Sequence, residues 1–172
     1  MDAAETLGFA PAAQLTAMLS AGEISPTELA AELTHRIAAV DDVADGSQSV
    51  LAMCVDIERQ VSALPDGPLR GLPVLIKDNI EAVGLPATAG SLALAGRPVS
   101  VDAPLVARLR AAGAVILGST NLSEWANMRS PMSSSGWSAI GGLTRNPWDL
   151  TRSAGGSSSG SGAALAAGLA PL

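Results

Sequence analysis

One apolar stretch stands out in the middle of the chain, LPVLIK at residues 72–77, which ends on a lysine. The five residues before the lysine, Leu72–Ile76, predict a buried strand that is interrupted only by Pro73. Downstream, residues 103–112 (APLVARLRAA) have helical spacing, and Asp102 is placed to cap that helix. A second apolar run, Ala114–Leu117, follows after a glycine. A strand, a helix and a strand in this order predict an α/β layered fold.

Two helices and a further strand are predicted before this stretch. Residues 12–20 (AAQLTAMLS) have helical spacing, and Gly22 ends that helix. The sequence SPTE at residues 25–28 supplies an N-cap, a proline at the first helical position and a capping-box glutamate. We expect this second helix to run to about Val40. After a polar loop, Val50–Val55 predicts a buried strand.

The composition predicts a single soluble domain that binds neither nucleic acid nor a membrane. The chain has 172 residues, a net charge of −6 and 48% hydrophobic residues, which is enough to build a core. This acidic balance is the opposite of the basic surface that a nucleic-acid partner requires. No uncharged apolar stretch reaches the length of about 18 residues that a membrane span needs. The first residues lack the pattern of a secretory signal, so we expect a cytoplasmic protein.

Cysteine and histidine are too scarce for a disulfide or a metal cluster. The chain contains one cysteine, Cys54, and one histidine, His35. A disulfide within the chain needs two cysteines, and a structural metal site needs several such ligands. We expect Cys54 to be a small buried hydrophobic residue, His35 to lie on a helix surface, and neither a metal nor a cofactor to be bound.

Serine and glycine dominate the segment from residue 127 to residue 162. Such a composition is typical of a flexible linker. Bulky apolar residues are interleaved with it, however, and they favour an ordered, winding loop that lines a site. We predict a short helix over Asn121–Asn127 before this loop and a small-residue helix over residues 159–168 after it. The chain then stops at Leu172 without a closing element, which favours a piece of a longer protein.

Lys77 is the only lysine among the ten basic residues. It follows an apolar strand, where burial disfavours the charged ammonium and lowers its pKa. A neutral lysine can act as a general base near pH 7. The alternative is an ordinary lysine at a strand end that pairs with Asp78 or Glu81.

The segment Gly155–Gly162 (GGSSSGSG) combines glycines with several hydroxyl groups at the start of a helix. It does not fit a phosphate-binding P-loop, which needs a lysine next to the glycines, or a dinucleotide fingerprint. It does fit a nucleophile elbow, G-x-S-x-G, centred on Ser158, although that motif needs a histidine downstream. A plain helix cap also stays open. Combined with Lys77, the serines favour a Ser–Lys arrangement, in which a lysine activates a serine without histidine.

These pieces together resemble the amidase signature family. The matching blocks occur in the family's order: Gly71–Asn79, Ala112–Gly118, Thr120–Glu124, Arg145–Asp149 and Gly155–Ser161. The resemblance implies an α/β fold with a mixed β-sheet covered by helices on both sides, here truncated. It implies that residues 1–172 are the N-terminal part of a single amidase signature domain. Residues 1–45 would form a helical region and residues 46–172 the start of the catalytic core.

The resemblance also implies a Ser–cis-Ser–Lys triad that hydrolyses a carboxamide bond through an acyl-enzyme. Carried over by position, Lys77 is the base and Ser157 the bridging serine, with a cis peptide bond between Gly156 and Ser157. The family places the nucleophilic serine 24 residues after the bridging serine. That position, 181, lies beyond Leu172, so we expect the 172-residue chain alone to be inactive and poorly soluble.

The substrate class implied is an amide, either a small molecule or a peptide. Residues 123–127 and 135–139 look most like bacterial peptide amidases, which release ammonia from C-terminally amidated peptides. Two alternatives stay open: a non-catalytic remnant, and the amidase subunit of a tRNA-dependent amidotransferase.

Overall fold

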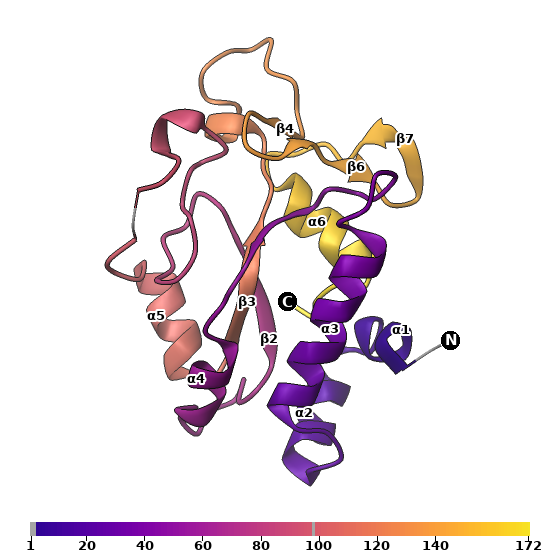
Figure 1. Ribbon diagram of the computed structural model, residues 1–172, viewed down its shortest axis with the longest axis vertical. Helices are drawn as coiled ribbons and strands as arrows, with labels where there is room; N and C mark the ends of the chain where they lie inside the picture. The colour runs from indigo at the N-terminus through magenta and orange to yellow at the C-terminus, as the bar shows by residue number, and fades with distance from the viewer. Residues whose placement is uncertain (1–2, 98) are drawn as a thin grey trace.

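The computed structural model describes residues 3–97 and 99–172, in which helices cover both faces of a small mixed sheet (Figure 1). The sheet consists of β1 (Val50–Met53), β2 (Pro73–Lys77) and β3 (Val115–Thr120). One face is covered by α1 (Ala3–Gly8), α2 (Ala12–Ala21), α3 (Pro26–Val40) and α6 (Ser159–Ala166). The other face is covered by α5 (Pro104–Ala111), and α4 (Ile57–Ser62) lies at the β1 edge.

Strand β3 occupies the centre of the sheet, antiparallel to β1 and parallel to β2. Helix α5 makes the crossover between the two parallel strands. All six residues of β3 are buried. In the register, Lys77 pairs with Thr120, so the carboxyl ends of β2 and β3 lie side by side. This edge is where α/β sheets usually place their ligand sites.

The two faces of the sheet bury alternate residues of the same strands. Leu75 and Leu117 pack with α2, α3 and α6, whereas Val74, Ile76 and Ile116 pack with α5. This alternation follows from the two-residue period of a strand. The predicted α/β layered fold is therefore confirmed.

Local sequence signals set the bounds of α2 and α3 as predicted. Gly22 ends α2 in the left-handed conformation, with φ of 70°. At the start of α3, the Glu28 backbone N–H donates to Ser25 Oγ at 3.2 Å, and the Ser25 N–H donates to Glu28 Oε2 at 2.9 Å. This is the predicted capping box, and α3 ends at Val40 as expected.

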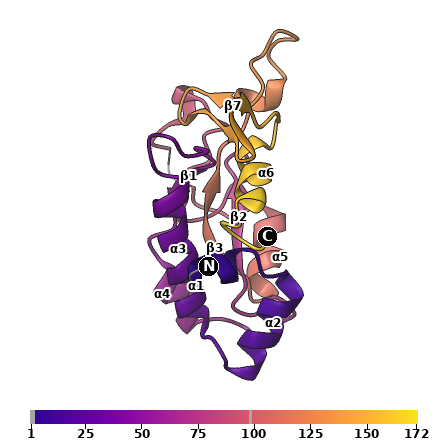
Figure 2. The same ribbon diagram turned by 90° about the vertical axis from the view of Figure 1, so that its right-hand side faces the viewer.

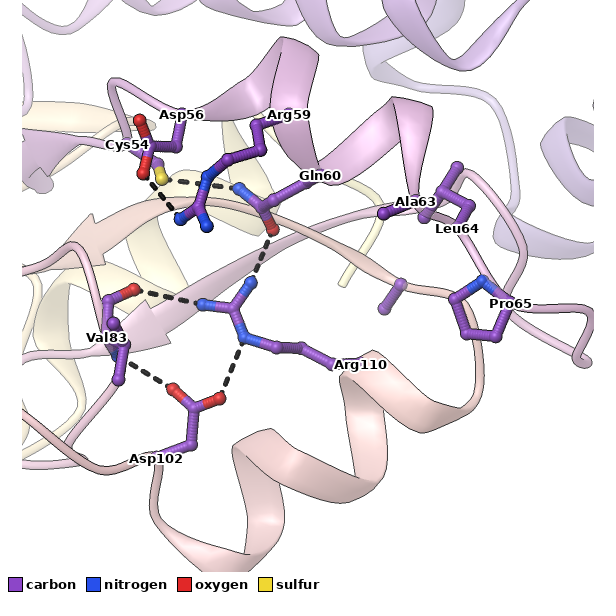
Figure 3. A pocket seen from close by; sticks show the side chains of 11 residues that line it. Cys54, Asp56, Arg59, Gln60, Ala63, Leu64, Pro65, Val83, Asp102 and Arg110 are labelled. Carbon is purple, nitrogen blue, oxygen red and sulfur yellow. Dashed lines mark hydrogen bonds and ion pairs between the residues drawn. The ribbon is translucent and has the colours of Figure 1, made fainter.

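The predicted cap of α5 is wrong. Ala103 occupies the N-cap position of this helix and makes no side-chain bond there. The Asp102 carboxylate instead accepts from the Val83 N–H at 2.7 Å and from Arg110 Nε at 2.9 Å (Figure 3). A carboxylate gains more from a charged guanidinium and a distant peptide group than from one local N–H, so tertiary partners override the local signal.

Strand β1 is shorter and less buried than predicted. It ends at Met53, its four residues are only partly buried, and Val55 is 89% exposed. The reason is that β1 is an edge strand with one neighbour, and the chain turns into α4 soon after it. Beyond the end of β1, the side chain of Gln60 takes over as the hydrogen-bond partner of β3. Its Nε2 donates to the Ile116 carbonyl at 3.0 Å, and its Oε1 accepts from the Ile116 N–H at 2.9 Å.

The Ser/Gly-rich segment is ordered, as predicted. It forms two small antiparallel pairs, β4 (Trp137–Ser138) with β5 (Gly142–Leu143) and β6 (Arg145–Asn146) with β7 (Asp149–Ser153). Figure 2 shows these pairs at the opposite end of the molecule from α2. Two short 3₁₀ helices complete the described elements, η1 (Leu92–Leu94) and η2 (Glu124–Asn127).

The helix predicted over Asn121–Asn127 is wrong. Only η2 is helical there, and Trp125, Ala126 and Asn127 have φ between 50° and 65°. Backbone with this left-handed sign is rare for residues other than glycine, and it is usually held by surrounding contacts. Of the remaining single-residue predictions, Cys54 is buried and His35 lies exposed on α3.

The longest helix, α3, has 15 residues. Over residues 3–97 and 99–172, the helices lack the combination of length and apolar character needed to traverse a bilayer.

Candidate active site

The structure brings Lys77 and Ser157 together although 80 positions separate them in the sequence. Lys77 Nζ donates to Ser157 Oγ at 2.9 Å, and it reaches Ser158 Oγ at the same distance. Lys77 arrives from the carboxyl end of β2, and the two serines stand immediately before α6. A primary amine thus faces two hydroxyl groups at the edge where the parallel strands end.

Burial at this edge lowers the pKa of Lys77 below its ordinary value, because the charged ammonium loses water. Within the described residues, Lys77 forms no ion pair with Asp78 or Glu81, which was the alternative interpretation of this lysine. A lysine with a lowered pKa is able to accept a proton nearer to neutral pH.

The backbone around Ser157 is fixed by close contacts. The Gly156–Ser157 peptide bond is cis, as the family resemblance implied. The Ser157 carbonyl accepts from the Ser123 N–H at 3.0 Å. A Cβ on Gly156 would lie 2.4 Å from Ser123 Oγ, so no side chain fits at this position without displacement.

Ser123 is a residue of the site that sequence reasoning did not single out. It is fully buried, and its Oγ accepts from the Gly136 N–H at 2.8 Å. It therefore ties the Ser/Gly-rich loop to the backbone that holds Ser157. The sequence singled out Ser158 only as the centre of a possible nucleophile elbow, and its hydrogen bond with Lys77 was not predicted.

Asp78 follows Lys77 directly but turns away into the interior. It is completely buried, and its Oδ2 accepts from the Thr88 N–H at 3.1 Å and from the Thr88 hydroxyl. Burial raises the pKa of this carboxyl group, and the Thr88 and Gly90 hydrogen bonds oppose that rise.

Known proteins match the chain over almost its whole length. A family model described as Amidase matches residues 28–172. The chain is a member of the amidase signature family. It shows 48% sequence identity and a TM-score of 0.85 with the native peptide amidase of Stenotrophomonas maltophilia, over 93% of this chain and 34% of that one.

Other relatives carry different activities in their names. A glutamyl-tRNA(Gln) amidotransferase subunit from Symbiobacterium thermophilum is 45% identical over 168 residues, which is 94% of this chain and 33% of the relative. The structure of 6-aminohexanoate cyclic dimer hydrolase has 35% identity and a TM-score of 0.83, over 95% of this chain and 33% of that one. The chain spans about a third of the length of the relatives it matches.

Family membership confirms the predicted amidase signature fold. At the candidate site, the structure supplies a lysine and two hydroxyl groups. Across the described residues, no group of three His, Cys, Asp or Glu side chains could hold a metal ion.

A cavity of about 380 Å³ lies away from Lys77 and Ser157, between α4 and α5 (Figure 3). Its walls include the Arg110–Asp102 ion pair and the Gln60 amide, and Lys77 and Ser157 are not among its lining residues. Two aspartates balance its two arginines, so the lining carries no net charge to select an ionic ligand.

Proposed function

We propose that the protein carrying this chain hydrolyses carboxamide bonds, with Lys77 as the base and Ser157 as the bridging serine. The observation that carries the proposal is the 2.9 Å hydrogen bond between Lys77 Nζ and Ser157 Oγ, formed by a lysine whose pKa burial lowers. A hydroxyl group between a base and a nucleophile can pass a proton in both directions.

The proton would move along a short path. A nucleophilic serine gives its proton to Ser157 Oγ while Ser157 gives its own to Lys77 Nζ. The serine oxygen attacks the amide carbonyl, and the C–N bond breaks as the relay returns a proton to the leaving ammonia or amine. Water then hydrolyses the resulting ester. By family position, the nucleophile is a serine 24 residues after Ser157.

For the substrate, we propose the C-terminal amide of a peptide. The support is 48% identity with a peptide amidase over 93% of the chain, together with the peptide-amidase-like segments at residues 123–127 and 135–139. A second candidate is the amidase component of a glutamyl-tRNA(Gln) amidotransferase, favoured by 45% identity with a subunit of such an enzyme. That candidate requires partner subunits, so co-purification of a stable complex would favour it.

We also propose that residues 1–172 belong to one domain rather than two. The support is a continuous core in which Leu29 and Leu33 of α3 pack with Leu75, Leu117 and the chain after α6. Because residues 1–45 and 46–172 share this core, we treat them as two parts of a single folding unit. A cytoplasmic location is likewise a proposal, resting on the composition.

The test uses the longest product of the reading frame that encodes these residues. Ammonia release from a C-terminally amidated dipeptide is measured for the unmodified protein, Lys77→Ala and Ser157→Ala. We expect each substitution to reduce kcat by about 10³-fold or more, because each breaks the proton path.

Arg108→Ala is the matched control, since it removes an exposed cation on α5. We expect this variant to keep full activity. An unmodified protein without amide turnover, or a Lys77→Ala protein that retains it, would overturn the proposal in favour of a non-catalytic remnant. The 172-residue chain alone is expected to show no turnover.

A further inference from the structure

The Lys77–Asp78 pair sits on a closed ring of hydrogen bonds. In one direction, Lys77 Nζ donates to Ser157 Oγ at 2.9 Å. In the other direction, Asp78 Oδ2 accepts from Thr88 N–H and the Thr88 hydroxyl, with the Gly90 N–H at 3.4 Å. Two neighbouring residues at the end of β2 therefore reach two different loops.

The loop held by Asp78 supports the turn at Trp125. The Ala89 N–H donates to the Asp78 backbone carbonyl at 3.0 Å, and the Ala89 carbonyl accepts from the Trp125 N–H at 2.9 Å. Ala89 has φ of 51°, a conformation that residues with a side chain rarely adopt. The hydrogen bonds of Asp78 hold the loop in this conformation.

The turn at Trp125 in turn leads back to Ser157. Ser123, two residues earlier, donates its N–H to the Ser157 carbonyl at 3.0 Å. The ring is then complete: from Lys77 to Asp78, through residues 88–90 to Trp125, through Ser123 to Ser157, and back to Lys77. Asp78 contributes a carboxylate to this ring that is 0% exposed, whereas the carboxylate of Glu124 accepts from the Ala139 N–H outside the ring.

We propose that Asp78 is a positioning residue: by fixing residues 88–90 it keeps Ser157 within hydrogen-bond distance of Lys77. The inference rests on the proposed function only in treating the Lys77–Ser157 pair as the proton relay.

A comparison with Asp41, a second buried aspartate, supports this assignment. Both oxygens of Asp41 are used: Oδ1 accepts from the Ser49 hydroxyl at 2.7 Å and Oδ2 from the Val50 N–H at 2.8 Å. Asp78 Oδ1 is buried and has no partner within the described residues. A buried acceptor without a partner costs stability, and such a cost is expected where a residue serves a site.

The competing role for Asp78 is that of a charged neighbour of Lys77, and the two roles predict opposite signs. A carboxylate acting through its charge stabilises the ammonium, so its removal would lower the pKa of Lys77. A carboxylate acting through position keeps Lys77 in its partly buried place. Its removal would then let Lys77 regain water, and the pKa of Lys77 would rise.

The experiment measures the pKa of Lys77 by NMR in the longest product of the reading frame that encodes these residues. The protein is grown with ¹³Cε-labelled lysine, to which residues 1–172 contribute a single signal, and that signal is assigned as the one missing from Lys77→Met. The signal is titrated in the unmodified chain, Asp78→Ala and Asp78→Asn. Circular dichroism first shows that each variant is folded.

In the unmodified protein the pKa of Lys77 lies below the ordinary lysine value of 10.5. We expect Asp78→Ala to raise this pKa by at least half of that difference. Asp78→Asn keeps an oxygen that accepts from the Thr88 N–H, and we expect the pKa to stay low. Either of two results would overturn the proposal. An unchanged pKa of Lys77 in Asp78→Ala would show that Asp78 is merely structural, and a lower pKa would show that Asp78 acts on Lys77 through its charge.

Two further sets of variants keep the test decisive. Asp41→Ala removes an equally buried aspartate outside the ring, and it should lower the melting temperature without moving the pKa of Lys77; an equal shift would overturn the proposal.

If Asp78→Ala does not fold, Thr88→Val and Thr88→Ser decide instead. The valine should raise the pKa and the serine, which keeps the hydroxyl, should not. Because this experiment does not measure amide turnover, its result can be interpreted even if the proposed function is wrong.

Discussion

Gly156 shows how a single residue limits what the site tolerates. A Cβ at this position would lie 2.4 Å from Ser123 Oγ and 3.0 Å from Ser135 Oγ. Both hydroxyls belong to the backbone scaffold that holds Ser157, so neither can move without disturbing it. The requirement for glycine therefore comes from close approach rather than from flexibility.

We expect Gly156→Ala to lower the free energy of unfolding by about 1–3 kcal/mol, the usual cost of overpacking. The matched control is Gly162→Ala, because a Cβ there meets nothing within 4 Å. Gly162 lies inside α6, where alanine is favoured over glycine by up to about 1 kcal/mol. Urea denaturation of the three chains measures both values, and equal effects at the two positions would contradict the steric argument.

At the residue scale, the sequence predicted the main pair but not its surroundings. Lys77 stood out as the only lysine, and Ser157 was assigned by family resemblance. The bonds from Ser123 and Thr88 were not predicted, because they join segments that are distant in sequence, and no local pattern specifies such pairings. The role of the pair in catalysis remains a proposal.

At the element scale, Gln60 performs a task that normally belongs to a strand. Its side-chain amide pairs with both the N–H and the carbonyl of Ile116, beyond the point where β1 ends. Gln60 Oε1 also accepts from Arg110 Nη1 at 2.7 Å, which links α4 to α5 (Figure 3). One side chain thus completes the hydrogen bonding of the central strand.

We expect Gln60→Ala to destabilise the fold by about 1–3 kcal/mol, because it leaves a buried peptide group without partners. Gln14→Ala is the control: Gln14 is exposed on α2, and surface substitutions usually change stability by no more than about 0.5 kcal/mol. Thermal unfolding followed by circular dichroism compares the two. A loss at Gln60 no larger than that at Gln14 would show that water can replace the amide.

Elements with local signals were the ones that the sequence predicted well. The capping box of α3 and Gly22 after α2 depend on residues within one helical turn. Asp102 was misassigned because its partners, Val83 and Arg110, come from other parts of the fold. The helix predicted over Asn121–Asn127 failed for the same reason, since the Ala89 carbonyl draws the Trp125 N–H out of a helical pattern.

At the scale of the whole molecule, the lowered pKa of Lys77 links proton binding to stability. In the unfolded chain Lys77 has its ordinary pKa, near 10.5, and in the folded chain its pKa is lower. Between these two values the unfolded chain binds more protons, so the stability contributed by this residue increases as the pH rises through the window. Below the pKa of Lys77 in the folded chain, the lysine is charged in both states, and the partial burial of its ammonium group lowers the stability of the fold.

A comparison of the unmodified chain with Lys77→Met tests this link. We expect the difference in unfolding free energy to shift in favour of the unmodified chain as the pH is raised from 7 toward 10.5. Titratable groups other than Lys77 are common to both chains, so their contributions cancel in the difference. Chemical denaturation at a series of pH values measures it, and a constant difference would contradict a lowered pKa.

The layered architecture of the molecule was easier to predict from the sequence than the structure at the edge of the sheet. The layered fold was predictable because β2, α5 and β3 each carry a clear apolar pattern. The partial exposure of β1 was not, since the position of a strand at a sheet edge depends on the order of the strands, which periodicity does not encode.

The solitary lysine has one more consequence, for enzymatic cutting of the chain. A protease that cleaves only after lysine has a single target here, the Lys77–Asp78 peptide bond. The Asp78 N–H at that bond donates to the Thr120 carbonyl at 3.1 Å, and Asp78 itself is buried. Proteolysis therefore requires the end of β2 to come away from β3 first. Cleavage after Lys77 by such a protease would therefore report how often the end of β2 separates from β3 at the candidate site.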